Sequence, residues 1–183
     1  MLFRSRASLA STLREGATFL QISNKTDMPL SVELLNWSGA QPEARPLRYA
    51  VFVTEQKVPV ELEWDEWDER SVHAIARIDG KPVGTGRLLP VSADGVVKIG
   101  RMAVSRELRG RGVGGAILAS LVERARQVGA RTALLHAQTE AAGFYRKAGF
   151  TAQGATFFEA GIPHVEMTLS LEGGAQAPSS VTR

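Results

Sequence analysis

Arg109-Gly110-Arg111-Gly112-Val113-Gly114-Gly115 is the stretch of this chain from which the fold can be predicted. It lies between a strand-like run, 97–104, and a helix-like run, 113–128. Glycines at a strand-to-helix junction let a ligand approach the backbone closely, and the free N–H groups of a helix N-terminus attract anions. Since the loop also carries two arginines, we interpret it as a phosphate-binding loop rather than as a flexible turn.

Two familiar phosphate-binding loops fit this stretch poorly. A Walker A loop ends in Gly-Lys-Ser or Gly-Lys-Thr, which is absent here, so a nucleoside triphosphatase is excluded. Gly110-x-Gly112-x-x-Gly115 matches the dinucleotide fingerprint, but that motif needs an acidic residue about 20 residues on, at the end of the next strand. The next strand-like run, 131–137, is followed by Gln138-Thr139, and Glu140 is the first acid. A dinucleotide-dependent oxidoreductase is therefore disfavoured.

A third pattern, Arg109-x-x-Gly112-x-Gly114, is accompanied by further motifs in a fixed order. They are LRYAVFVTEQKVP (47–59), VGTGRLL (83–89), KIGRMAV (98–104), LHAQ (135–138), FYRKAGF (144–150) and FFEAGIPHVEM (157–167). Together these motifs resemble the GNAT superfamily of N-acetyltransferases, in its small bacterial group often called ElaA-like or YjcF-like. The similarity extends over about 30–171.

The resemblance implies an α/β (α+β) fold, the GNAT acyl-CoA N-acyltransferase fold. We expect a mixed, mostly antiparallel sheet flanked by helices. Strands 96–104 and 131–137 should run parallel, joined by a right-handed crossover through helix 113–128. In the family this central pair splays apart, and the pantetheine arm of the cofactor enters the gap.

Local patterns place the other elements. They predict an edge strand at 30–37, a loop containing Pro42, a helix starting at Pro46, a short acidic helix at 60–68, a hairpin of 72–78 and 82–91 around Asp79-Gly80, a helix at 140–148 capped by Thr139, and two strands within 151–171. Gly129 and Gly149 are expected to end helices.

One domain is expected, at 29–171. Residues 1–28 are interpreted as an N-terminal extension, either a disordered accessory arm or a stretch ahead of a natural start at Met28. Residues 172–183 are interpreted as a disordered tail, because glycine, alanine, proline and serine dominate them.

Composition excludes several classes of protein. The 44% hydrophobic and 22% charged residues are ordinary for a globular protein, and no apolar run is long enough to cross a membrane. Cysteine is absent and only three histidines occur, so disulfides, thiolate metal sites and a cysteine nucleophile are excluded, and no metal site is expected. A cytoplasmic protein is consistent with this.

Charge is unevenly distributed along the chain. Segment 98–131 has eight basic and two acidic residues, which suits a polyphosphate cofactor. Segment 61–70 has six acidic residues and one basic residue, which suits either a cationic amine substrate or a solvated surface. Nucleic acid is not an expected partner, because helix-turn-helix, zinc-finger and RNA-binding motifs are absent.

The resemblance implies that acetyl-CoA is the cosubstrate. Its pyrophosphate would be bound by the loop residues Arg109, Gly110, Arg111, Gly112, Val113, Gly114 and Gly115, and its pantetheine and thioester by the backbone of Met102, Ala103 and Val104. Tyr145, at the tyrosine position of the family motif, is the candidate general acid. Many relatives have asparagine where this chain has Thr139, so Gln138 and Thr139 must replace its hydrogen bond to the cofactor.

The general base and the acceptor site stay open. Candidates for the base are Glu55, His73, His136, Glu159 and His164; candidates for substrate binding are Glu55, Arg87, Arg101 and Glu159. The two arginines would hold a substrate carboxylate or simply pair with the acidic segment.

Because the usual covalent nucleophile is absent, we expect direct acetyl transfer to a primary amine of a small molecule or peptide. The alternative is a non-catalytic acyl-CoA sensor. Relatives often dimerise through sheet edges, so a homodimer is one expectation.

Overall fold

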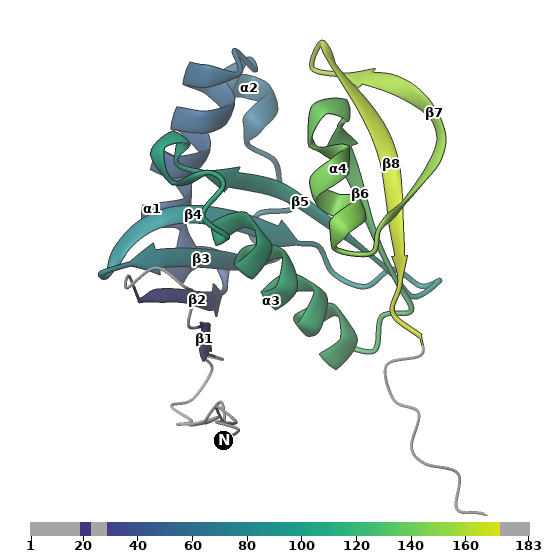
Figure 1. The fold of residues 1–183 in the computed structure, drawn as a ribbon, viewed down its shortest axis with the longest axis horizontal. Helices are drawn as coiled ribbons and strands as arrows, with labels where there is room; N and C mark the ends of the chain where they lie inside the picture. Colours follow the sequence, from purple (N-terminus) through teal and green to yellow (C-terminus); the bar gives the residue numbers. More distant parts are fainter. Residues whose placement is uncertain (1–18, 23–28, 173–183) are drawn as a thin grey trace, which may run out of the picture.

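The computed structural model describes residues 19–22 and 29–172, and its strands form one sheet in the order β1-β2-β3-β4-β5-β6-β8-β7 (Figure 1). The strands are β1 (Phe19–Ile22), β2 (Leu30–Leu35), β3 (Val72–Ile78), β4 (Lys81–Leu88), β5 (Val96–Val104), β6 (Thr132–Gln138), β7 (Thr151–Glu159) and β8 (Ile162–Ser170). Neighbouring strands are antiparallel except for β5 and β6, which are parallel. The mixed, mostly antiparallel sheet that was expected is confirmed.

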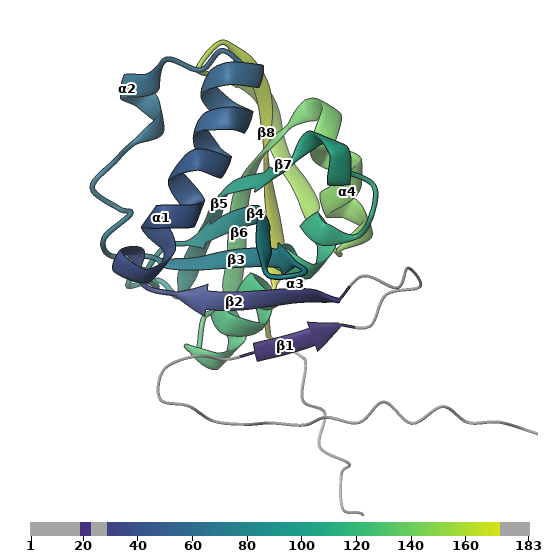
Figure 2. The ribbon, with the colours of Figure 1, turned by 90° about the vertical axis from the view of Figure 1, so that its left-hand side faces the viewer.

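Helices cover both faces of this sheet. They are α1 (Trp37–Arg48), the π-helical turns η1 (Tyr49–Glu55), α2 (Val60–Glu63), the 3₁₀ turn η2 (Arg106–Leu108), α3 (Val113–Gln127), the 3₁₀ turn η3 (Thr139–Ala141) and α4 (Ala142–Lys147). Figure 2 shows α1 on one face and α3 with α4 on the other. The apolar stripe of α3, including Ile117 and Leu121, is fully buried and forms the centre of the core.

Helix α3 packs very closely on β4, and glycine at position 86 makes this possible. A Cβ atom placed on Gly86 would lie 2.7 Å from Sδ of Met102, 2.8 Å from Cγ2 of Ile117 and 2.9 Å from Cδ1 of Leu121. Such distances are shorter than van der Waals contact. The glycine therefore fixes how near the crossover helix comes to the strand that borders β5.

Strand β5 is distorted on one side and largely unpaired on the other. Its parallel pairing with β6 extends only from Val96 to Lys98, after which the two strands part, as the family resemblance implied. On the β4 side Thr85 faces Ala103 while Arg87 faces Gly100, so that two residues of β5 oppose one of β4. This is a β-bulge, and it contains Arg101 with a positive φ of 51°. The sequence did not reveal it.

The region before η1 differs from the expectation, because Pro42 and Pro46 both lie inside α1. The helix begins earlier than predicted because Asn36 caps it, its Oδ1 accepting from the Gly39 amide at 3.0 Å. Trp37, Ala40 and Ala44 are buried on the face that packs against β3. This burial outweighs the loss of intrahelical hydrogen bonds at the prolines, which local sequence rules treat as helix breakers.

Two other predicted helices are shorter than expected. The acidic helix is limited to α2 and is followed by turns, while helix 140–148 is divided into η3 and α4. Thr139 makes no side-chain cap to α4, which begins three residues later, so the predicted N-cap is wrong. The predicted turn at Asp79-Gly80 is confirmed by positive φ values of 50° and 74°, and Gly129 and Gly149 follow their helices with φ of 76° and 92°.

The N-terminal segment 1–28 contributes strand β1, which pairs antiparallel with β2 and makes β2 an internal strand instead of the predicted edge. The remaining calls on this segment, and the predicted tail 173–183, lie outside the described residues. Among the helices described, none has the length and hydrophobicity needed to cross a membrane.

Candidate active site

A cavity of about 720 Å³ opens where β5 and β6 part. One wall comes from η1, α2 and the following turns; the other comes from β6, α4 and the β7–β8 hairpin. The floor is β5 from Lys98 to Met102, including the bulge. Among the predicted site residues, Arg87, Arg101, Met102, His136, Gln138, Tyr145 and Glu159 line this cavity.

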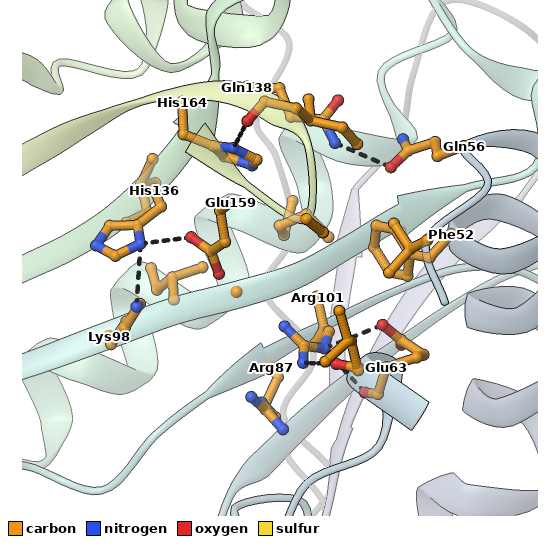
Figure 3. Close-up of a pocket in the computed structure, with 18 of the residues that line it drawn as sticks. Phe52, Gln56, Glu63, Arg87, Lys98, Arg101, His136, Gln138, Glu159 and His164 are labelled. Atoms are coloured by element: carbon orange, nitrogen blue, oxygen red, sulfur yellow. Dashed lines mark hydrogen bonds and ion pairs between the residues drawn. The ribbon is translucent and has the colours of Figure 1, made fainter. Parts of the chain in front are cut away.

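Three titratable side chains from three strands meet on one side of the cavity (Figure 3). Nδ1 of His136 lies 2.9 Å from Oε2 of Glu159 and 3.3 Å from Nζ of Lys98. Nε2 of His136 lies 3.8 Å from Oε2 of Glu166. Two of the predicted site residues, His136 and Glu159, are therefore in direct contact.

Burial and charge shift the pKa values in this group. Burial lowers the pKa of the Lys98 ammonium, although the charge of Glu159 partly opposes this. For Glu159, burial tends to raise the pKa, but the hydrogen bond from His136 and the nearby charges outweigh it, and the pKa is lowered. Glu159 is therefore ionised at neutral pH, and the Lys98 amine loses its proton more readily than a surface lysine.

Behind the opposite wall lies a buried cluster of ion pairs around Arg48, whose side chain is fully buried. Arg48 Nε donates to Glu63, and its Nη1 donates to Asp68 Oδ1 at 2.7 Å. The Arg48 guanidinium also lies over the ring of Trp64, 4.7 Å from the centroid. His73, one of the five base candidates, is buried here with Nε2 donating to the Asp68 carbonyl at 2.9 Å, outside the cavity.

The predicted substrate arginines belong to the same cluster. Arg87 Nη1 donates to Asp68 Oδ1 at 2.7 Å and its Nη2 to Asp65 Oδ2 at 2.9 Å, while Arg101 lies 3.2 Å from both Glu63 and Asp65. Pairing with the acidic segment, one of the two roles expected for these arginines, is what the structure shows. Burial raises the pKa of Glu63, although Arg48 opposes this. The buried carboxylates of the acidic segment therefore neutralise the positive charges of these arginines.

Tyr145 is packed with its ring edge-on against Phe144 and Phe150, at centroid distances of 4.9 and 6.1 Å. Its side chain is 9% exposed and lines the cavity. Burial raises the pKa of the Tyr145 phenol to about 12. The structure therefore shows the packing role of Tyr145, and its role as general acid stays a prediction.

The glycine-rich loop lies at the end of β5, and its Arg109 is held by an ion pair. Nη1 and Nη2 of Arg109 donate to the two oxygens of Glu55 at 2.6 and 2.8 Å, and Nε donates to the Val104 carbonyl at 3.1 Å. This bidentate hydrogen bond to Arg109 lowers the pKa of Glu55. Neither side chain lines the cavity. The structure thus brings Glu55 to the loop rather than to the other candidate bases.

The N-terminus of α3 presents main-chain N–H groups at this loop. Gly110 and Gly112 have positive φ values of 76° and 87°, and no side chain caps the helix at Gly112. Arg111 and Gly112 are exposed, and a Cβ placed on Gly110 or Gly115 would meet nothing within 4 Å. An open, uncapped helix start of this kind binds anions.

Two further predicted residues are placed by side-chain contacts. Gln138 Nε2 donates to Oε1 of Gln56 at 2.9 Å, which joins β6 to the end of η1 across the cavity (Figure 3). His164 lines the cavity, and its Nδ1 donates to the Ile162 carbonyl at 2.8 Å. Gln56 was not identified from the sequence, because no local pattern links residues 82 positions apart.

Lys98 and Phe158 were also missed. A lysine in an apolar run that reads as a central strand is unusual, and this signal could have drawn attention to Lys98. Phe158 is 76% exposed at the cavity and lies at the end of β7, next to the turn at Ala160 and Gly161. Among the described residues, no cluster of side chains suited to a metal ion is present.

Comparison with known proteins identifies the family to which this chain belongs. A family model described as an acetyltransferase (GNAT) domain matches residues 40–171. The chain is 42% identical over 122 residues to YjcF of Bacillus subtilis, described as an uncharacterised N-acetyltransferase, covering 66% of this chain and 86% of that protein.

Solved structures agree with this comparison. An acyl-CoA N-acyltransferase from Pseudomonas aeruginosa superposes with a TM-score of 0.68 at 31% identity, covering 76% of this chain and 98% of that one. Escherichia coli ElaA superposes with a TM-score of 0.69 at 28% identity over the same shares.

The parted parallel strands, the cavity between them and the loop at the start of α3 define an acyl-CoA N-acyltransferase. The chain belongs to the GNAT acetyltransferase family, in the small bacterial group represented by YjcF and ElaA. It is an N-acetyltransferase, and its cosubstrate is an acyl-CoA.

Proposed function

We propose that this protein transfers the acetyl group of acetyl-CoA directly to a primary amine of a small molecule or peptide. The observation that carries the proposal is the cavity at the parted strands, which brings the protonated hydroxyl of Tyr145 into one space with the acid–base group of His136 and Glu159. Direct transfer is favoured because the chain has no cysteine to carry an acyl group.

The residues that would hold acetyl-CoA lie in two places. The α3 N-terminus, with the N–H groups of Gly112 to Gly115 and the side chain of Arg111, suits the pyrophosphate. The backbone of Met102, Ala103 and Val104 lies beyond the last β5–β6 pair, where β5 has no strand partner on its β6 side among the residues that the structure describes. Such main-chain groups can bind the amides of the pantetheine arm, as a neighbouring strand would.

Acetyl transfer makes three demands on the protein. The acceptor ammonium must lose a proton, the developing oxyanion needs hydrogen-bond donors, and the departing sulfur needs a proton. The thioester of the cosubstrate supplies the activated carbonyl. Main-chain N–H groups at the bulge in β5 would stabilise the oxyanion, and Tyr145, with its pKa raised to about 12, remains protonated at neutral pH and can donate to sulfur.

The alternative is an acyl-CoA sensor that binds the same molecule without turnover. The hydroxyl of Tyr145 beside the cavity favours catalysis, because binding alone does not require a proton donor there. We further propose a cytoplasmic enzyme, from the absence of cysteine, and leave open a homodimer formed through a sheet edge.

Titration calorimetry with acetyl-CoA, coenzyme A and NAD tests the proposal. We expect binding of acetyl-CoA and coenzyme A and none of NAD, followed by release of the coenzyme A thiol with members of a primary-amine panel. Replacing Arg109 and Arg111 together by alanine should weaken coenzyme A binding, whereas Arg126→Ala, an exposed arginine in the last turn of α3, should not. Binding of acetyl-CoA without turnover of any amine would favour the sensor, and no binding would refute both.

A further inference from the structure

Lys98 is the most unusual group in the cavity, because it is an amine in the central parallel strand pair of the sheet. It lies at the last β5–β6 residue pair, opposite Leu134, where the strands begin to part. Its Nζ contacts Nδ1 of His136 at 3.3 Å, and the same Nδ1 contacts Glu159 at 2.9 Å. One nitrogen atom thus has two polar partners.

Whether Nδ1 of His136 carries a hydrogen bears on whether the Lys98 amine is charged or neutral. An ionised carboxylate can only accept, so His136 must carry its hydrogen on Nδ1 to donate to Glu159. With this hydrogen in place, Nδ1 offers no acceptor to an ammonium at 3.3 Å, whereas a neutral Lys98 amine can share the Nδ1 hydrogen through its lone pair. The reverse arrangement, an ammonium donating to Nδ1, would leave the Glu159 carboxylate facing a lone pair at 2.9 Å.

Burial and the surrounding charges together make the Lys98 ammonium easier to deprotonate. Burial is the largest influence on the pKa of Lys98 and lowers it. The charged groups that act on the amine come from four strands: Arg87 on β4, Arg101 on β5, Glu159 on β7 and Glu166 on β8. The two arginines lower the pKa further, while the two carboxylates raise it without reversing the effect of burial.

Resting on the N-acetyltransferase function proposed above, we propose that Lys98 is the general base of this enzyme. Its neutral amine takes a proton from the acceptor ammonium, and His136 with Glu159 holds Nζ in place and neutralises the charge that results. This assigns the base to a residue outside the set of five candidates taken from the sequence.

The proton balance of the reaction closes with this assignment. The acceptor nitrogen loses two protons as its bond to the acyl carbon forms and the carbon–sulfur bond breaks. One proton goes to Lys98 and then to solvent past Glu159, whose side chain is 49% exposed. The other replaces the proton that Tyr145 gives to the departing sulfur, so that both side chains return to their starting states.

The protonation of Lys98 can be measured without any acceptor, by competitive labelling of the intact protein with trace acetic anhydride over a range of pH. Peptide mass spectrometry then follows each lysine separately. Lys98 should become reactive at lower pH than the exposed Lys81 and Lys147, which serve as internal controls. If Lys98 titrates together with these two lysines, or above them, the proposal is wrong. Because no turnover is needed, this result is independent of whether the N-acetyltransferase function holds.

The catalytic role is tested with the panel amine that gives the highest rate. Lys98→Arg keeps a positive charge but cannot lose its proton, so kcat/KM should fall by about 100-fold or more, with acetyl-CoA affinity unchanged. Lys98→Cys creates the sole cysteine of the chain, which 2-bromoethylamine converts into a less basic lysine analogue. Alkylation should restore activity and move the acidic limb of the pH–rate profile to lower pH.

Two results would overturn the catalytic assignment. In the first, Lys98→Arg keeps nearly full kcat/KM with the same pH profile. In the second, Lys98 itself becomes stoichiometrically acetylated during turnover, which would make it an acceptor rather than a base. Failure of the wild-type protein to bind acetyl-CoA would instead refute the proposed function, while the labelling experiment would still report the state of Lys98.

Discussion

Replacing Arg48 by methionine should cost this protein a substantial part of its stability. Arg48 is fully buried, and its guanidinium donates to the Glu63 carboxylate, to Asp68 Oδ1 at 2.7 Å and to the Glu63 carbonyl at 2.8 Å. Methionine fills similar space but leaves these acceptors buried without the hydrogen-bond donors of Arg48. Removing one partner of a buried ion pair typically costs about 3–5 kcal/mol.

The structure places the expected loss near the lower end of that range. Asp68 keeps Arg87 at 2.7 Å, and Glu63 keeps Arg101 at 3.2 Å, so neither carboxylate is left without a cation. We expect a loss of about 3 kcal/mol in the free energy of unfolding. At about 2–4 °C per kcal/mol for a domain of this size, the midpoint of thermal unfolding should fall by about 6–12 °C.

Urea unfolding followed by tryptophan fluorescence would measure this loss, because Trp37 and Trp64 lie next to the Arg48 guanidinium. The control is Arg126→Met, which breaks a surface pair of 3.8 Å with Glu123 and should change stability by less than about 0.5 kcal/mol.

The loss of unfolding free energy in the Arg48→Met variant should also depend on pH. Burial raises the folded-state pKa of Glu63. Without Arg48 that rise is larger, so the folded variant binds more protons and its deficit should shrink as pH falls. A loss below about 1 kcal/mol with an unchanged urea dependence would refute the assignment of Arg48 as the centre of this cluster.

Three other substitutions test separate parts of the site. Glu55→Gln releases Arg109 from an exposed ion pair worth about 0.2–1 kcal/mol, so coenzyme A should bind about 1.4- to 5-fold more tightly by calorimetry. The gain in affinity should exceed that of the charge-matched control Glu107→Gln, and weaker binding would mean that Glu55 positions Arg109 for the ligand. Tyr145→Phe should lower turnover more than acetyl-CoA affinity, and equal rates would leave Tyr145 a packing residue. Because the phenol pKa is about 12, the ratio of wild-type to variant rates should stay constant between about pH 6 and about pH 10. Gly86→Ala should destabilise the protein by about 1–3 kcal/mol in urea through overpacking between β4 and α3, and an unchanged midpoint would contradict the close contact described above.

The sequence predicts well those features that local chemistry determines. Helix α3, the turn at Asp79-Gly80 and the glycines that end helices follow from apolar periodicity and positive φ. The order of motifs carries the resemblance to the GNAT superfamily, and that resemblance predicts the parallel pair and its parting. The two prolines of α1 show the limit of local rules, because burial of Trp37, Ala40 and Ala44 against the sheet decides whether that helix continues.

The candidate site could be predicted only in part. His136 and Glu159 were selected one by one, and nothing local indicated that β6 and the β7–β8 hairpin bring them to 2.9 Å. The sequence allows two roles for Arg87 and Arg101, binding a substrate carboxylate or pairing with the acidic segment. Which role applies depends on how residues 61–70 fold over β4 and β5. The bulge at Arg101 could not be located from the sequence, because it is defined by the loss of register against β4, which depends on how the two strands pair.

The parting of β5 from β6 after Lys98 gives this protein a sheet edge in its interior. Exposed edges are usually hazards, because their unpaired main-chain groups can template pairing with other chains and lead to aggregation. Here η1 and α2 on one side and the β7–β8 hairpin on the other enclose the edge, so a second polypeptide strand with its side chains has little access. We expect this enclosure to act as a size filter that admits a slender, amide-bearing arm to the same hydrogen-bonding groups while protecting the protein from self-association through them.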